Sequence, residues 1–413
     1  KLPVHLPVSM EAVATYGDTS AKATEALVPP GGVRPGIGGL ELTLASTALG
    51  NFDEGMRQLV EYPYGCLEQI NSRLVPFIAL RELHGKFGVG YQAPQQQDDS
   101  DALLLAWLGA PALQLHDTSD PDEVVRKTVK AIEQLQNPDG GFRYWASSRC
   151  SDQWASAYAT LTLGRAAEVG YPVDRKVLEN AQRFLSDHVA AGKCVECGWG
   201  CNPPDAPTRV FALYALARTR APKPSYYGAL WSERSSLPLF SQAMLADAIF
   251  VGKGDRAQAR QLLAELLNHA KESPAELHFE ESDPRTYASL WSSDLRTTAL
   301  VLQTLVDVTP DHPFVAKMAR YLVKARRPDG RFRNTQEAAF SLMALTEVVR
   351  VKEKQSPDFV AKVLLGDEQL AAVPFKGRSM GVERRSVPID ELAAKGGKQP
   401  LVFERDGTAG VLY

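Results

Sequence analysis

The two ends of the chain and its middle carry different hydrophobic periods. Near the N-terminus, Leu40, Leu42 and Leu44 alternate with polar residues, which predicts a half-buried strand. Near the C-terminus, an Asp-Gly dipeptide at 406–407 lies between two short apolar runs, and this pattern predicts a β-hairpin. Strand-like sequence on both sides of a helical middle is expected when one domain is inserted into a loop of another.

From about residue 51 to residue 351, apolar positions follow the helical period. One helix is predicted to begin with Asp120 as its N-cap and to end before the turn 137–142, Asn-Pro-Asp-Gly-Gly-Phe. A similar phrase recurs at 328–332. Helices are predicted between the two phrases around 209–217, 239–250, 257–267 and 295–306. Helical hairpins repeated at about 40–50 residues favour a closed α/α toroid, although an open solenoid has the same local pattern.

Length and charge narrow the class of protein. The 413 residues predict about two or three domains with a sizeable core. With 46 basic and 49 acidic residues, the chain lacks the charge of a nucleic-acid-binding protein and gives no reason to expect direct membrane contact. Charged residues interrupt every apolar stretch before the roughly 18 residues of a membrane span. The chain begins at Lys1 and ends in strand-like sequence at Tyr413, so we interpret it as a piece of a longer protein.

The 5 cysteines form an odd set. Cys194, Cys197 and Cys201 are closely spaced, and Cys150 can serve as a fourth member. Four thiolates would make a closed zinc site, whereas in an oxidising compartment the same four would form two disulfides with three alternative pairings. The absence of a second Cys-x-x-Cys pair favours disulfides. Cys66 is then left over.

Cys66 occupies a predicted turn, made by Pro63 and Gly65, that leads into a helix. Because helical spacing resumes after it, Cys66 and Gln69 are expected on one helix face, three residues apart. A helix N-terminus lowers the pKa of a thiol, and a thiolate here can attack the Gln69 carboxamide and expel ammonia. The product is an internal thioester that stores an acyl group. The alternative is an inert cysteine that packs as a small apolar residue.

The segment 62–69, Tyr-Pro-Tyr-Gly-Cys-Leu-Glu-Gln, resembles the thioester motif of the α2-macroglobulin and complement family, and its leucine resembles the bacterial members. The resemblance implies a mainly α fold in which an α/α-toroid thioester domain is inserted in a CUB-like β-sandwich. The toroid is expected at 49–351 and the two halves of the CUB-like domain at 1–48 and 352–385. A following macroglobulin-like β-domain or a linker is expected to start at 386–413.

The resemblance also implies a function. It implies a broad-range protease inhibitor and not an enzyme, without a cofactor or metal: Cys66 is the thiol donor, and the Gln69 acyl group is captured by a lysine of the target protease. Glu68 matches the carboxylate of the motif, and its expected role is to order the turn. The implied location is periplasmic or otherwise extracytoplasmic, with an anchor in a part of the chain not present here. Other domains of the same full-length chain are the remaining expected partners.

The sequence departs from the family pattern downstream. Many members carry a histidine shortly after a Pro-Asp-Gly-x-Phe phrase, but residues 143–154 contain none. Asp152 and Gln153 occupy this region and are candidates to assist acyl transfer. Without an imidazole, direct attack by amines is favoured over attack by hydroxyls. Four aromatic residues are candidates to keep water from the thioester: Tyr62, Tyr64, Trp145 and Trp154.

Two other functions remain open. Toroids of this kind also host glycosidases and lyases, which need two carboxylates roughly 5–10 Å apart. The candidate acids occupy turn positions, where they are expected for backbone reasons alone: Asp139, Asp152, Glu280, Glu281 and Asp283. The remaining alternative is a binding scaffold whose cysteine is inert.

Overall fold

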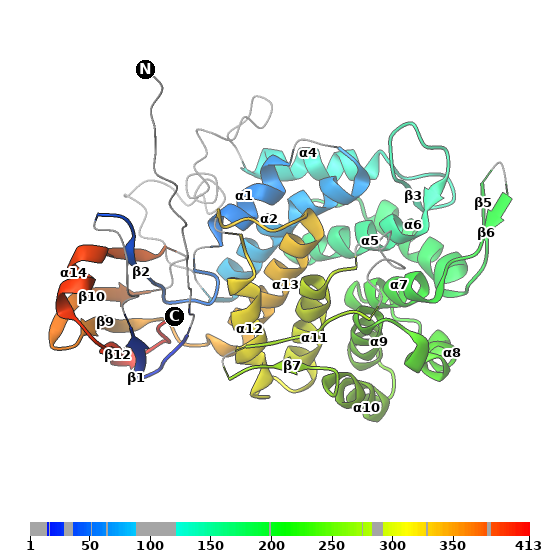
Figure 1. The fold of residues 1–413 in the computed structure, drawn as a ribbon. Helices are drawn as coiled ribbons and strands as arrows, with labels where there is room; N and C mark the ends of the chain where they lie inside the picture. Colours follow the sequence, from blue (N-terminus) through cyan, green and yellow to red (C-terminus); the bar gives the residue numbers. More distant parts are fainter. Residues whose placement is uncertain are drawn as a thin grey trace, which may run out of the picture.

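A ring of helices and a smaller β-sandwich make up the structure, a computed structural model (Figure 1). The structure describes residues 15, 17–28, 36–50, 52–62, 65–87, 121–197, 200–274, 276–282, 292–327, 329–377 and 381–413. Within these residues, no helix is both long and apolar enough to cross a bilayer.

The inner layer of the ring consists of helices that are buried along most of their length. Each packs against the next, and the last packs against the first, so the ring is closed. The predicted toroid is therefore confirmed over the open solenoid. Burial on almost every side explains why α9 has hardly any polar face. The inner helices are α2 (Leu67–Phe87), α5 (Gln153–Glu168), α7 (Ala206–Arg218), α9 (Leu239–Val251), α11 (Asp294–Val308) and α13 (Thr335–Lys352).

The outer layer consists of amphipathic helices that cover the inner ring. In α12 one face is buried while the other residues are more exposed; the buried residues are Val315, Met318, Ala319, Leu322 and Val323. The outer helices are α1 (Asp53–Glu61), α4 (Pro121–Glu133), α6 (Arg175–Phe184), α8 (Tyr227–Ser232), α10 (Arg256–Leu267) and α12 (Phe314–Lys324). Short hairpins connect some of the helices: β3 (Phe142–Arg143) with β4 (Ser151–Asp152), β5 (Val195–Cys197) with β6 (Gly200–Asn202), and β7 (Lys271–Glu272) with β8 (Leu277–His278).

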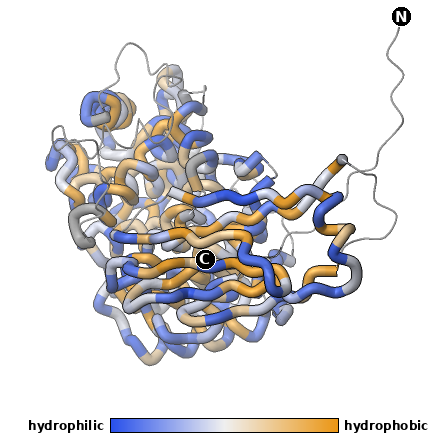
Figure 2. The backbone as a smooth tube through the Cα atoms, turned by 90° about the vertical axis from the view of Figure 1, so that its left-hand side faces the viewer, coloured by the Kyte–Doolittle hydropathy of each residue, from blue (hydrophilic) through white to orange (hydrophobic). Residues whose placement is uncertain are grey.

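Two antiparallel sheets form the β-sandwich. The larger has the order β1 (Lys22–Leu27), β12 (Gln399–Ala409), β9 (Asp358–Leu365), β10 (Glu368–Lys376), and the smaller pairs β2 (Gly39–Leu44) with β11 (Glu383–Pro388), which α14 (Ile389–Lys395) follows. Leu42 and Leu44 of the smaller sheet share one hydrophobic core with Phe359 and Val363 of the larger. In Figure 2 the sandwich faces the viewer, and hydrophobic and hydrophilic positions alternate along its strands.

The chain enters and leaves the helical ring at neighbouring points of the sandwich. The Ala48 N–H donates to Glu353 Oε1 at 2.8 Å, although 305 residues separate them. Ala45 and Tyr413 exchange two backbone hydrogen bonds of 2.9 Å. The toroid is thus inserted in the β-sandwich, as the change of hydrophobic period predicted.

Two expectations for the C-terminal segment 386–413 need correction. Strand β12 lies between β1 and β9, where Leu401 is paired with both Glu25 and Leu365, so this segment completes the sandwich instead of starting a separate domain or linker. The hairpin at 406–407 is also absent, because β12 runs through it. A Cβ at Gly407 would lie 2.4 Å from the Asp358 carbonyl oxygen, so glycine is needed for the close approach of β9 and not for a turn.

Candidate functional site

Cys66 and Gln69 lie together at the start of α2. Cys66 directly precedes the helix, is 1% exposed and forms no disulfide. Its backbone N–H donates to Gln69 Oε1 at 3.3 Å, so the carboxamide folds back over the first turn of the helix. The structure therefore brings the two predicted partners together, with a donor on the carboxamide oxygen.

The pKa of the Cys66 thiol is set by opposing effects. Burial raises it, while the backbone N–H of Gln69, the Tyr144 hydroxyl and the backbone N–H of Glu68 lower it through hydrogen bonds. The Glu68 carboxylate raises it further, and the net pKa lies above the ordinary value. The expectation of a lowered thiol pKa is therefore wrong: the helix N–H groups act as predicted, but desolvation outweighs them.

Tyr144 is the residue at this site that the sequence analysis missed. Its hydroxyl hydrogen-bonds with the Cys66 sulfur, and its carbonyl accepts from the Leu67 N–H at 2.9 Å. Its ring is partly buried against the toroid core. Burial raises the pKa of Tyr144 well above its usual range, and the contact with Cys66 adds to the rise. A signal was present, because Tyr144 comes two residues after the Pro-Asp-Gly-x-Phe phrase, where only a histidine was sought.

Glu68 joins the start of α2 to the start of α13. The side chain is fully buried, and Oε1 accepts from Ser72 Oγ at 2.8 Å, Thr335 Oγ1 at 2.7 Å and Gln336 Nε2 at 2.7 Å. Oε2 is also buried and has no hydrogen-bond partner within the described part of the chain. Glu68 thus ties two inner helices together next to Cys66, and none of these contacts is with the turn itself.

The aromatic candidates occupy different places. Trp154 is 7% exposed, and its ring lies 5.8 Å from Tyr158 and 5.5 Å from Phe211, centroid to centroid, within the core. Trp145 is 48% exposed and contacts the ring of Tyr144 at 5.7 Å. Tyr62 is partly exposed, and its carbonyl accepts from an arginine of α2. Tyr64 lies outside the described residues.

Asp152 and Gln153 open helix α5. Asp152 is its N-cap, and Oδ1 accepts from the Ala155 N–H at 2.7 Å. Burial raises the pKa of Asp152 against the lowering effect of these backbone donors. Its charge also contributes to the raised pKa of Tyr144. Asp152 therefore lies near the Cys66–Tyr144 pair with its carboxylate engaged in the helix cap.

The other cysteines are paired where their side chains are described. Cys150 and Cys197 form a disulfide with 5.5 Å between their Cα atoms, and Cys194 is also disulfide-bonded. The side chain of Cys201 is outside the description. No group of three or more His, Cys, Asp or Glu side chains in the described ranges could hold a metal ion. The Cys150–Cys197 disulfide links the residue before strand β4 to strand β5.

The carboxylates considered for glycoside hydrolysis serve as backbone caps and in a local pair. Asp139 accepts from the Gly141 N–H at 3.0 Å, and Glu281 accepts from the N–H groups of Leu239 and Phe240 at the start of α9. Glu280 pairs with His278 at 3.2 Å. Asp283 lies outside the described residues. These contacts give no support to an acid and base pair.

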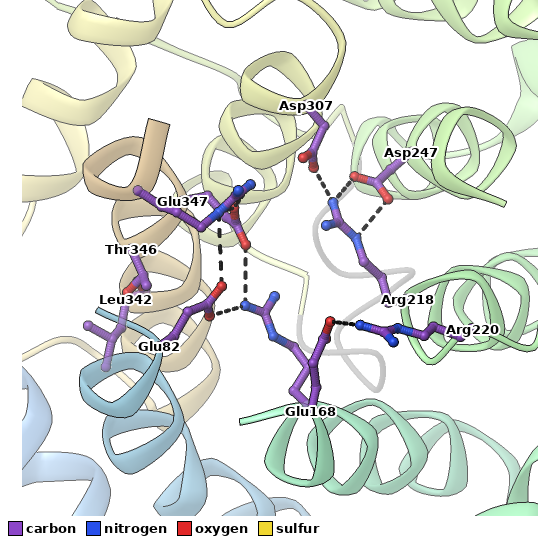
Figure 3. A network of polar contacts seen from close by, with 11 residues as sticks. Glu82, Glu168, Arg218, Arg220, Asp247, Asp307, Leu342, Thr346 and Glu347 are labelled. Atoms are coloured by element: carbon purple, nitrogen blue, oxygen red, sulfur yellow. Dashed lines mark hydrogen bonds and ion pairs between the residues drawn. The ribbon is translucent and has the colours of Figure 1, made fainter. Parts of the chain in front are cut away.

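A second polar cluster lies toward the C-terminal ends of the inner helices (Figure 3). Arg165 donates to Glu82 at 2.6 Å and to Glu347 at 3.2 Å, and Arg218 donates to both Asp247 and Asp307. Glu82 follows Cys66 by 16 residues, which is about 24 Å along a helix. This cluster, to which each of the six inner helices contributes a residue, was not predicted from the sequence.

Comparison with known proteins relates the chain to one family. A family model described as "A-macroglobulin TED domain" matches residues 225–348. The chain is 23% identical over 386 residues to the alpha-2-macroglobulin homolog of Nostoc sp., covering 92% of this chain and 18% of that protein. It therefore spans less than a fifth of that relative's length.

Two solved structures share the fold. Native alpha-2-macroglobulin of Escherichia coli, from domain MG7 to the C-terminus, has a TM-score of 0.59 and 19% identity, covering 95% of this chain and 55% of that one. Salmonella alpha-2-macroglobulin reacted with methylamine has a TM-score of 0.57 and 20% identity, covering 96% and 23%. These likenesses agree with an α/α toroid joined to a β-domain. The chain is therefore similar to proteins of the alpha-2-macroglobulin family.

Proposed function

We propose that Cys66 and Gln69 form an internal thioester and that the chain is the thioester domain of a broad-range protease inhibitor. The observation that carries the proposal is the buried Cys66, whose backbone N–H donates to Gln69 Oε1 at 3.3 Å. The similarity to the alpha-2-macroglobulin family and the reaction of the Salmonella relative with methylamine support it.

The geometry suits formation of the bond. The Cys66 sulfur attacks the Gln69 carboxamide carbon, the C–N bond breaks, and ammonia leaves with the thiol proton. The Cys66 N–H lies on the carboxamide oxygen, where negative charge develops during the attack. Burial of Cys66, with Trp154 in the core and Trp145 against Tyr144, would keep water from the product.

In the proposed action the bond is used once. A protease cuts elsewhere in the full-length chain, a lysine amine of that protease attacks the Gln69 acyl carbon, and Cys66 is released as a thiol. No turnover follows, so the protein acts as a suicide inhibitor and not as an enzyme. The absence of histidine from 143–154 favours this direct attack by an amine.

The wider assignments belong to the same proposal. The β-sandwich around the toroid would be the CUB-like domain, and its C-terminal strand β12 would belong to that domain. The Cys150–Cys197 disulfide suits a periplasmic or otherwise extracytoplasmic location. Target proteases and other domains of a longer chain would be the partners, with the anchor outside the present sequence.

Mass spectrometry of the intact chain tests the thioester. We expect the untreated chain to be lighter by one ammonia, and methylamine treatment to add one methylamine and release one thiol. Peptide mapping extends the test to chains that have already hydrolysed, because hydrolysis converts the side chain at position 69 to glutamate. Gln58 of α1, whose side chain forms two hydrogen bonds with the backbone of Phe332, serves as the control for general deamidation.

The outcome that contradicts the thioester is specific. The proposal fails if position 69 remains glutamine in every preparation while Cys66 is freely alkylated.

Capture of a protease is tested by mixing the thioester-bearing chain with a lysine-containing protease and with the same protease after acetylation of its lysines. A covalent adduct is expected only with the unmodified protease. Equal adducts would contradict capture through lysine.

A further inference from the structure

Besides the contact with Gln69, Cys66 has a hydrogen bond between its sulfur and the hydroxyl of Tyr144. Building on the proposed thioester, we propose that Tyr144 donates the proton that the Cys66 sulfur takes up when the acyl bond breaks. Tyr144 would then be a catalytic residue of the acyl transfer, in a chain whose 143–154 segment lacks a histidine.

Rigid elements hold the Tyr144 hydroxyl at the sulfur. The Tyr144 carbonyl accepts from the Leu67 N–H at 2.9 Å, which fixes it to the first residue of α2. The preceding residues form strand β3, whose Phe142 is fully buried and pairs with Asp152 of β4. The residue before β4, Cys150, is tied by its disulfide to β5. The backbone around Tyr144 is thus fixed at α2, in the core and through the disulfide.

The chemistry of the leaving group calls for a proton donor. The departing sulfur takes the electron pair of the C–S bond into a buried place, where a bare thiolate is disfavoured, as the raised pKa of Cys66 indicates. Burial also raises the pKa of Tyr144, followed by the effects of Cys66, Glu68 and Asp152. The phenol therefore stays protonated, and it can give a proton to the sulfur but is a poor base in the resting site.

Two carboxylates near this turn have hydrogen bonds with other groups. Glu68 Oε1 accepts three hydrogen bonds, two of them from α13, and Asp152 caps α5. Neither carboxylate has a described contact with the sulfur. Tyr144 has one, and it comes from a segment outside the Cys66–Gln69 motif.

The proposed step conserves atoms and charge. The lysine nitrogen attacks the Gln69 acyl carbon, and a C–N bond forms as the C–S bond breaks. The Tyr144 proton passes to the sulfur, and the proton lost by the nitrogen returns to the phenolate oxygen. The products are an amide at position 69 and a neutral Cys66 thiol, with Tyr144 unchanged.

The test compares Tyr144→Phe with Tyr321→Phe. Tyr321 is also a partly buried tyrosine, but it lies on the outer helix α12 and stacks on His278. In each chain whose thioester is verified by mass, thiol release by methylamine is followed over a range of pH. We expect Tyr144→Phe to slow the reaction about tenfold to a hundredfold, since positioned proton transfer contributes at least that much. Tyr321→Phe should react like the unaltered chain.

A second variant keeps the shape of the side chain. Fluorotyrosine at position 144 makes the phenol more acidic, so the proton transfer and thiol release should become faster below the new phenol pKa. If Tyr144→Phe forms no thioester, the fluorotyrosine variant alone tests whether Tyr144 donates the proton. Unchanged rates in both variants would overturn the role of Tyr144 while leaving the thioester intact. Failure of the unaltered chain to form a thioester would overturn the proposed function and this inference with it.

Discussion

The two ends of the toroid bury charge in different ways. Toward the C-terminal ends of the inner helices, the carboxylates lie against arginines: Arg165 joins Glu82 to Glu347, and Arg218 joins Asp247 to Asp307 (Figure 3). At the Cys66 end, Glu68 is held through one oxygen by neutral donors, and its other oxygen has no hydrogen-bond partner in the described residues.

The two ends of the toroid therefore have different roles, closure of the ring at one end and adjustment of the thiol site at the other. Ion pairs between inner helices compensate the buried charges at the arginine end and link helices that are distant in sequence, so this end helps to close the ring. At the Cys66 end, Glu68 forms no ion pair with the residues that the structure describes, and its charge adds to the effect of burial in raising the pKa values of Cys66 and Tyr144. Perturbed groups gathered around one thiol are typical of a functional site.

The strongest test of this separation is Cys66→Ala. The substitution should abolish methylamine incorporation at position 69, because the sulfur needed to activate the acyl group is removed. The free energy of unfolding should fall by only about 1 kcal/mol, since a small buried side chain is replaced by a slightly smaller one. Peptide mapping and urea unfolding measure the two effects. Incorporation that persists in Cys66→Ala would show that position 69 reacts by another route.

Arg218→Met is the converse change at the other end. It leaves Asp247 and Asp307 without the guanidinium that both contact, and breaking a buried pair from one side costs about 3–5 kcal/mol. The midpoint of urea unfolding should fall accordingly. Thioester content per folded molecule should stay the same under conditions where the variant is folded. Loss of the thioester from well-folded Arg218→Met would contradict the independence of the two ends.

The pH dependence of stability tests the arginine end in another way. Burial raises the pKa of Asp247 to about 7, against the lowering effect of Arg218 and with a further raise from Asp307. The folded state then holds a proton that the unfolded state releases near pH 4, so this contribution is full below about pH 4 and is lost as the pH rises to about 7. The slope is roughly 1 kcal/mol per pH unit.

Asp247→Asn should remove that decline, because the amide does not titrate. Urea unfolding from pH 5 to pH 8 gives the comparison, with the exposed Asp187→Asn as the control that keeps the slope of the unaltered chain. Parallel curves for the unaltered chain and Asp247→Asn would mean that Asp247 is ionised throughout this range.

What the sequence could predict follows the same division between local and distant interactions. The turn before α2, the i to i+3 placement of Cys66 and Gln69 and the amphipathic outer helices depend on neighbours in sequence. The arginine cluster depends on side chains from positions 82 to 347 that meet only after the ring closes. The pKa of Cys66 was predicted in the wrong direction for that reason, because the local helix effect is readable and the desolvation by packing is not. Gly407 likewise lies in a strand that pairs with β9, about 50 residues away in the sequence.

Glu68→Gln gives the smallest expected effect. The carboxamide keeps an oxygen for Ser72, Thr335 and Gln336, so the link between α2 and α13 should survive with a loss of about 1–2 kcal/mol from the weaker hydrogen bonds to a neutral group. Because the Glu68 charge raises the pKa of Cys66, its removal should lower that pKa. In chains treated beforehand with methylamine, the pH profile of Cys66 alkylation should therefore move to lower pH.

Glu61→Gln, an exposed substitution at the end of α1, is the control and should leave the alkylation profile in place. If Glu68→Gln also leaves it in place while unfolding at lower urea, Glu68 acts only as a link between helices. Both ends of the toroid would then use their buried acids for closure alone. If the alkylation profile moves without loss of stability, the charge of Glu68 acts on the pKa of Cys66 and not on the link between the helices.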